Sequence, residues 1–221
     1  MDAPYLAIDA STYEGSVAIV RGSDVLHDAL VPMRGEHEER LMPAVAAALD
    51  ACGLRPGSLS FVACGAGPGS FTSLRIAGAI AKGLAVSGRR PLVVASSLAL
   101  TAAAQALSPG RYLVTSNAMR GEVYLQGVQV HSDGFVSVLD EPALATDSRV
   151  AEILRSSGWQ LVGGSDDATG PILRARGFSR LTPGVLAEVD TATWEPVYGR
   201  LAEAQVQWER RHGRPLDPSS A

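Results

Sequence analysis

Three short apolar runs, separated by polar clusters, occupy the first part of the chain. The runs are Tyr5–Asp9, Ser16–Arg21 and Val25–Val31, and turn-forming residues fill Ala10–Gly15 and Gly22–Asp24 between them. Runs of this length with such punctuation predict a three-stranded antiparallel meander.

The pattern then changes to helical spacing. Leu41, Val45, Ala48, Leu49 and Cys52 share one face of a predicted helix that ends at Gly53. The other elements predicted for the first half are a strand, a helix, a strand and a helix, at Phe61–Ala66, Thr72–Val86, Leu92–Ala95 and Ser97–Leu107.

The predicted helix 72–86 is unusually apolar. More than half of its circumference is covered by the side chains of Leu74, Ile76, Ala77, Ile80, Ala81 and Leu84. A helix with so wide an apolar surface is buried on more than one side. We therefore expect one side to pack on the chain's own core and another to contact a second chain.

The second half of the chain begins with the same order of elements. Its predicted elements are three strands, a helix, a strand, two short helices and a terminal helix, at Tyr112–Ser116, Glu122–Val130, Phe135–Asp140, Arg149–Ser156, Gln160–Val162, Asp167–Arg174, Pro183–Val189 and Tyr198–Arg211. With a boundary near Ser108–Gly110, the chain divides into residues 1–108 and 109–221. An α/β fold with a duplicated β-β-β-α-β-α unit is the organisation of the actin, sugar-kinase and heat-shock ATPase superfold.

Composition narrows the class of protein. The 221 residues are 46% hydrophobic and 19% charged, which is typical of a globular chain, and a net charge of −4 argues against a broad cationic face for nucleic acid. The start Met1–Pro4 lacks the basic region of a secretory signal, and no apolar stretch reaches the roughly 20 residues of a membrane span. Cys52 and Cys64 fit two reduced thiols. We expect a cytoplasmic protein without membrane contact.

One segment with candidate chemistry follows the first predicted strand. Asp9 ends that strand, and Ser11 and Thr12 lie in the turn after it. In nucleotide-binding members of the superfold this turn faces the phosphates, and the acid reaches a hydrated metal ion. The alternative is a hairpin turn in which the three side chains bind nearby backbone amides. The two interpretations stay open at this point.

A second segment, Gly65–Thr72, has three alternating glycines between a strand and a helix. Glycines allow close approach by another group, and Ser70 or Thr72 can cap the helix, whose first amides would then bind an anion. The segment lacks the third glycine of a dinucleotide fingerprint and the Gly-Lys-Ser/Thr of a Walker loop. A tight strand-to-helix turn is the alternative. Arg75, in the first helical turn, suggests a carboxylate or phosphate nearby.

The histidines do not indicate a metal site. His27, His37, His131 and His212 are not spaced as metal ligands are. No nucleophile elbow marks a catalytic serine. We therefore expect neither a metal ion nor a catalytic residue in this chain.

The run Gly67-Pro68-Gly69-Ser70-Phe71-Thr72-Ser73-Leu74-Arg75-Ile76, followed by Ala81-Lys82-Gly83-Leu84-Ala85, resembles the hallmark of the bacterial TsaB family, also called YeaZ. Four other stretches are similar to family sequences: Leu6–Thr12, Leu41–Pro43, Gly121–Tyr124 and Glu195–Tyr198. The similarity extends over nearly the whole chain.

The resemblance implies a role. TsaB proteins are non-catalytic subunits that pair with the catalytic paralogue TsaD. With the ATPase TsaE, the pair supports transfer of threonylcarbamoyl to the tRNA adenosine beside the anticodon. TsaB also forms homodimers when its partner is absent, through an overlapping face. The chain would thus have no cofactor of its own, ATP and metal would be bound by partner subunits, and tRNA would be reached indirectly through the complex.

In such proteins the partner face is formed by two helices, which match 38–51 and 72–86 here. The interface expected from the resemblance comprises Leu41, Val45, Gly67, Pro68, Gly69, Ser70, Phe71, Thr72, Leu74, Arg75, Ala77 and Ala81. Asp9, Ser11 and Thr12 would be a vestigial phosphate turn.

Departures from the family pattern bear on the chemistry. Ser73 replaces a glycine, which adds a side chain where helices approach closely. Asn117 and Met119 stand where the family usually has aspartate and arginine, so a second carboxylate is missing and metal–nucleotide binding is disfavoured. A stand-alone ATP-dependent kinase or ATPase of the same superfold is the alternative function. A metallopeptidase, a label once attached to the wider family, has no histidine pair to support it.

Overall fold

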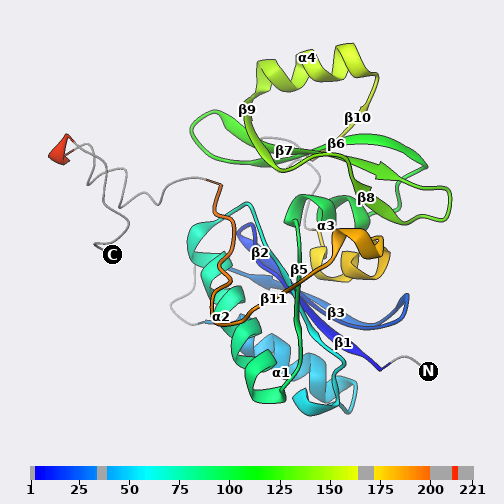
Figure 1. Ribbon diagram of the computed structural model, residues 1–221, viewed down its shortest axis with the longest axis vertical. Helices are drawn as coiled ribbons and strands as arrows, with labels where there is room; N and C mark the ends of the chain where they lie inside the picture. Colours follow the sequence, from blue (N-terminus) through cyan, green and yellow to red (C-terminus); the bar gives the residue numbers. More distant parts are fainter. Residues whose placement is uncertain (1–2, 34–38, 164–171, 200–210, 214–221) are drawn as a thin grey trace.

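Two β-sheets with a helical layer between them form the body of the molecule in the computed structural model (Figure 1). The structure describes residues 3–33, 39–163, 172–199 and 211–213. Helices α1 (Leu41–Ala51) and α2 (Phe71–Gly88) cover the outer face of the first sheet, and α4 (Asp147–Ser157) covers the outer face of the second. Between the sheets lie α3 (Ser97–Ala103) and the 3-10 segment η2 (Arg174–Arg180).

The first sheet has the strand order β11-β5-β4-β1-β2-β3. Strands β1 (Tyr5–Asp9), β2 (Glu14–Arg21) and β3 (Asp24–Pro32) form an antiparallel meander. Strands β4 (Val62–Gly65) and β5 (Leu92–Ala95) run parallel to β1, and β11 (Ala187–Val189) lies at the edge. The predicted meander is confirmed. Strand β1 is central because β4 pairs with it in parallel and β2 in antiparallel orientation.

The second sheet has the order β10-β6-β7-β8, with β9 also pairing with β7. Its strands are β6 (Gly110–Asn117), β7 (Glu122–Val130), β8 (Val136–Val138), β9 (Ala143–Thr146) and β10 (Gln160–Gly163). Strand β10 runs parallel to β6, as β4 runs parallel to β1 in the first sheet. The α/β class with sheets of the actin and sugar-kinase type is therefore confirmed.

The alternation of side chains along β1 decides which of them face α1 and α2 and which face α3. Leu6 and Ile8 belong to the cluster with the buried faces of α1 and α2, whereas Tyr5 and Ala7 belong to the cluster with α3 and the second sheet. Because side chains alternate along a strand, Asp9 points to the same side as Tyr5 and Ala7, toward α3. The periodicity of the first strand thus places the carboxylate between the sheets.

Two of the predicted elements differ from the structure. The short helix expected at Pro183–Val189 is wrong: a 3-10 turn, η3 (Pro183–Val185), is followed by β11, whose backbone pairs with the otherwise free edge of β5. The helix expected over Ser97–Leu107 ends at Ala103, because Arg176 and Arg180 donate to the Ala104 and Gln105 carbonyls beyond it.

Other parts of the chain are only partly described. Most of the predicted helices 167–174 and 198–211 lies outside the described residues. The division at residue 108 stays a prediction. Ala175 N–H nevertheless donates to Ser16 Oγ of the first sheet (2.9 Å), so the chain returns to that sheet after building the second. No helix among the described residues is long and apolar enough to cross a bilayer.

Candidate functional site

The carboxylate of Asp9 lies at the centre of the candidate site and is fully buried. Oδ1 accepts hydrogen bonds from the amide and hydroxyl of Ser11 (3.1 and 2.9 Å). Oδ2 accepts one from Ser97 Oγ at the start of α3 (2.6 Å), and Ser97 Oγ in turn accepts the Gly67 N–H (3.0 Å). A buried charge is tolerated when it is hydrogen-bonded in this way. Asp9 therefore ties β1, its turn, α3 and the glycine-rich loop together.

The second hydroxyl of the turn is also engaged by the chain itself. Thr12 Oγ1 donates to Glu14 O (3.0 Å) and accepts from Arg174 Nη1 (3.0 Å). Arg174 is buried, and its Nε donates to Thr101 Oγ1 on α3 (3.0 Å). Asp9 and Thr12 accept the nearby Ser11 and Glu14 amides, as in the hairpin-turn interpretation, and both also bind partners distant in the chain. Sequence reasoning did not find Arg174, because no local pattern distinguishes a buried arginine from a solvated one.

The glycine-rich loop packs directly on this turn. Ser70 N–H donates to Ser11 O (2.7 Å), and a Cβ added at Gly69 would lie 2.0 Å from the same carbonyl oxygen. A Cβ added at Gly65 would lie 1.9 Å from Asp9 Oδ2. Glycine is required at both positions because backbone and carboxylate come too close for any side chain.

The start of α2 differs from the anion-site alternative. Ser70 occupies the N-cap position but makes no capping hydrogen bond, and its hydroxyl pairs with that of Ser73 (3.1 Å). Ser73 is itself buried in the chain, so the departure from glycine is accommodated by this hydroxyl pair. Arg75 lies over the ring of Phe71, 5.0 Å from its centroid, and Thr72 is exposed.

A small hollow opens between the two sheets beside the Asp9 turn. Its volume is about 80 Å³, and it is lined by Ser11, Thr12, Tyr13, Gly69, Ser70, Ser116, Asn117, Ala118, Met119 and Tyr124. Ligand pockets commonly measure about 300–1,000 Å³. Asn117 lies on the opposite wall, where its Oδ1 accepts the Met119 N–H (2.7 Å). The residues of this site do not fit a nucleotide with its metal ion, because the hollow is too small and the Asp9 carboxylate is buried behind its lining and already hydrogen-bonded.

No group of three or more His, Cys, Asp or Glu side chains suited to a metal ion occurs in the part of the chain that the structure describes.

Residues 194–199, which we call the strap, lie along α2. Val197 N–H donates to Ala66 O (2.7 Å), beside the glycine-rich loop. Rings of Pro196 and Trp194 lie against Gly78, within 3.3 and 3.4 Å of the place a Cβ would take. The strap therefore covers the side of α2 on which Gly78 lies.

Charged and aromatic side chains fasten the strap. Lys82 Nζ lies 3.1 Å from Glu195 Oε1, and this hydrogen bond lowers the pKa of Glu195. The Tyr198 hydroxyl donates to Glu195 Oε2 (3.2 Å), and burial raises the pKa of this hydroxyl. The centroid of the Tyr198 ring lies 4.5 Å from that of the Phe71 ring. Tyr124 OH donates to Tyr198 O (3.0 Å), which links the strap to the second sheet.

Seven of the twelve residues expected in the partner interface are buried, among them Gly67 and Pro68 of the glycine-rich loop. Leu41, Val45, Ala77 and Ala81 are 0% exposed and pack in the core between the first sheet and its two helices, and Leu74, also 0% exposed, lies under Gly67 of the glycine-rich loop. Their assignment to a partner interface is wrong for this reason. The apolar girdle of α2 is present, and Ala77 and Ala81 occupy the side of it that faces the sheet.

The surface that the two helices do present consists of other residues. Exposed positions with small or apolar side chains are Met42, Ala46 and Ala47 on α1 and Ala79, Gly83 and Val86 on α2, with Ile76 and Ile80 half-buried beside them. We call this the α1–α2 face. The opposite, buried sides of both helices pack on the first sheet.

Strand order, the paired sheets and the acid-bearing turn after β1 define an α/β protein of the actin and sugar-kinase superfold. Residues 32–154, more than half of the chain, match a family model described as TsaD, tRNA N6-adenosine threonylcarbamoyltransferase. The tRNA threonylcarbamoyladenosine biosynthesis protein TsaB of Bacillus subtilis is 30% identical over 92% of this chain and 96% of its own length. The protein of the same name from Escherichia coli is 34% identical over 72% of this chain and 70% of its own length.

A solved structure of YeaZ from Pseudomonas aeruginosa aligns with a TM-score of 0.73 and 25% identity, over 89% of this chain and 99% of that one. With these matches, the chain belongs to the TsaB family, also called YeaZ.

Proposed function

We propose that the chain is a non-catalytic subunit in the biosynthesis of tRNA threonylcarbamoyladenosine. It would pair with a TsaD homologue and, together with a TsaE homologue, support transfer of threonylcarbamoyl to the tRNA adenosine next to the anticodon. The involvement in this modification is supported by relatives of nearly full length that carry the name of that biosynthesis.

The non-catalytic assignment rests on the hydrogen bonds that the chain itself makes to the Asp9 carboxylate. Its buried carboxylate accepts hydrogen bonds from Ser11 and Ser97, and the hollow beside the following turn has a volume of about 80 Å³. A phosphate–metal site needs free carboxylate oxygens and room for several phosphate oxygens. ATP and its metal ion would therefore be bound by the partner subunits.

The partner would be bound by the α1–α2 face. Small side chains at Ala46, Ala79 and Gly83 allow another pair of helices to approach closely, and Met42 and Val86 supply exposed apolar area, at 41% and 62% exposure. The same face would serve for a homodimer when the partner is absent, since a two-fold interface uses one patch on both copies.

A calorimetric titration of the chain alone with ATP and magnesium tests the non-catalytic assignment. We expect no binding at micromolar concentration.

Replacing Asp9 by Asn removes charge-assisted hydrogen bonds worth about 2 kcal/mol of unfolding free energy, which lowers Tm by roughly 4–8 °C in a chain of this size. The exposed Asp24, changed to Asn, is the control and should leave Tm unchanged.

The alternative function, a stand-alone kinase or ATPase, predicts the opposite. Micromolar ATP binding with turnover, lost in Asp9→Asn, would contradict the proposal.

A further inference from the structure

A group of arginines lies at the end of the first sheet where α1 and α2 both terminate. Arg55 follows the end of α1 by four residues, Arg89 is the C-cap residue of α2, and Arg90 comes next in the chain. Arg90 donates to the Gly57 carbonyl, two residues beyond Arg55, so the segments are in contact. We call Arg55, Arg89 and Arg90 the arginine end.

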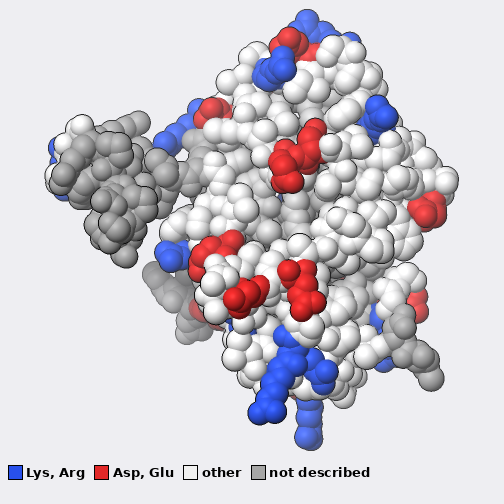
Figure 2. All heavy atoms as spheres, in the orientation of Figure 1, with Lys and Arg blue, Asp and Glu red and all other residues white. Residues whose placement is uncertain are grey.

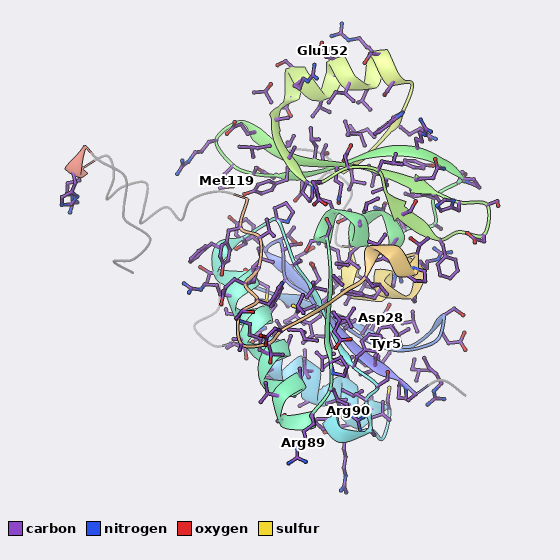
Figure 3. The ribbon with its side chains drawn as sticks, in the orientation of Figure 1. Tyr5, Asp28, Arg89, Arg90, Met119 and Glu152 are labelled. Atoms are coloured by element: carbon purple, nitrogen blue, oxygen red, sulfur yellow. The ribbon has the colours of Figure 1, made fainter. Side chains whose placement is uncertain are left out.

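The arginine end is a feature of the surface. Figure 2 shows Lys and Arg side chains gathered at the lower end of the molecule, with the acidic side chains of that view above them, and Figure 3 places Arg89 and Arg90 there. Arg55 and Arg89 are exposed, and Arg90 is half-buried. A chain with a net charge of −4 therefore has a locally basic end.

These guanidinium groups have no carboxylate partner among the described residues. The ion pairs found there join Lys82 to Glu195, Arg149 to Glu152 and Arg176 to Asp28. Asp50, in the last turn of α1, is the nearest acidic residue in the sequence and makes no ion pair with the arginine end in this part of the structure. The exposed guanidinium groups of Arg55 and Arg89 attract anions, and their planar fork matches phosphate oxygens.

Stabilisation of the helix ends explains only in part why arginines occupy these positions. Cations near helix C-termini interact favourably with the helix dipole. However, Arg89 has φ +51°, in the left-handed region where glycine is favoured at the end of a helix, so the backbone alone would select a different residue.

The position of the arginine end favours RNA as its partner. The α1–α2 face ends where these helices end, so the arginines adjoin the surface proposed to bind the catalytic subunit. A tRNA held by that subunit carries one phosphate per nucleotide, and contacts to phosphates need charge but no base-specific geometry. We propose that the arginine end contacts the phosphate backbone of the tRNA in the assembled complex. This inference rests on the proposed function.

The test uses the complex of this chain with its TsaD homologue and an unmodified tRNA. Binding is measured at a series of salt concentrations for the wild type and for the double variant Arg55→Gln/Arg89→Gln. Each phosphate contact contributes roughly 0.7–0.9 to the slope of log K against log salt. The double variant should lower the slope by about 1.6, which corresponds to about 40-fold weaker binding at 0.1 M salt. Arg90 is left unchanged because its hydrogen bond to Gly57 belongs to the fold.

The matched control is Arg111→Gln/Arg155→Gln, which removes the same charge from exposed positions of the second sheet and α4. It should bind tRNA with the wild-type slope. An unchanged slope in the arginine-end variant, an equal loss in the control, or loss of the TsaD homologue from the variant complex would each overturn the inference. Failure of the wild-type complex to assemble or to modify tRNA would instead contradict the proposed function.

Discussion

A glutamate at Ala79 is expected to weaken pairing with a TsaD homologue by about 100-fold or more, since a long charged side chain blocks the close approach of helices there and must lose its water in the interface. Ala79 is exposed on the α1–α2 face, so the isolated chain should keep its Tm. Co-elution in size-exclusion chromatography and titration calorimetry measure the loss of pairing.

A glutamate two residues earlier, at Ala77, distinguishes an effect on the core from an effect on the partner face. Ala77 is 0% exposed, so Ala77→Glu places a charge between α2 and the first sheet and should lower the unfolding free energy by more than about 4 kcal/mol. Ala151→Glu, at an exposed position of α4, controls for added charge and should change neither property. Pairing by Ala79→Glu at wild-type affinity would show that the α1–α2 face is not the interface.

Replacing Gly69 by Ala is expected to destabilise the chain by about 3 kcal/mol through overpacking. Its Cβ would lie 2.0 Å from Ser11 O and 2.7 Å from Ser11 C, and backbone atoms cannot move aside as a flexible side chain can. The glycine-rich loop would separate from the turn after β1 and lose the hydrogen bond from Ser70 N–H to Ser11 O. Chemical denaturation measures the change.

Gly184 is the matched control for Gly69. It is exposed in η3, and a Cβ added there meets no atom within 4 Å, so Gly184→Ala should leave stability within about 0.5 kcal/mol of the wild type. Equal stability of the Gly69 and Gly184 variants would mean that the loop does not depend on its contact with the turn.

The sequence predicts the elements of the first sheet well because their signals are local. The apolar runs of β1–β3 and the helical spacing of α1 reappear with ends within about two residues. Strand β11 has no such signal, since it exists because the edge of β5 offers unpaired backbone groups from a distant part of the chain.

The candidate site was recognised from the sequence in part. Asp9, Ser11 and the glycine-rich loop were correctly singled out, and the structure brings them into contact. The sequence does not decide between a phosphate site and a hairpin turn, because Ser97 and Arg174, which bind the Asp9 and Thr12 side chains, lie 88 and 162 residues away from them in the chain.

The sequence does not separate the buried and exposed sides of α2 for a related reason. Its apolar residues surround more than half of the helix, so periodicity alone does not say which stripe meets the sheet. The strap adds a third contact through Gly78, which no pattern within the helix indicates.

The most direct test is a reconstituted modification reaction. A purified TsaD homologue, a TsaE homologue, ATP, the threonylcarbamoyl adenylate and unmodified tRNA are combined with and without this chain, and modified adenosine is quantified by mass spectrometry of the digested tRNA. We expect modification only when the chain is present, with Asp9→Asn retaining activity at temperatures below its Tm. Full modification without the chain would contradict the central proposal.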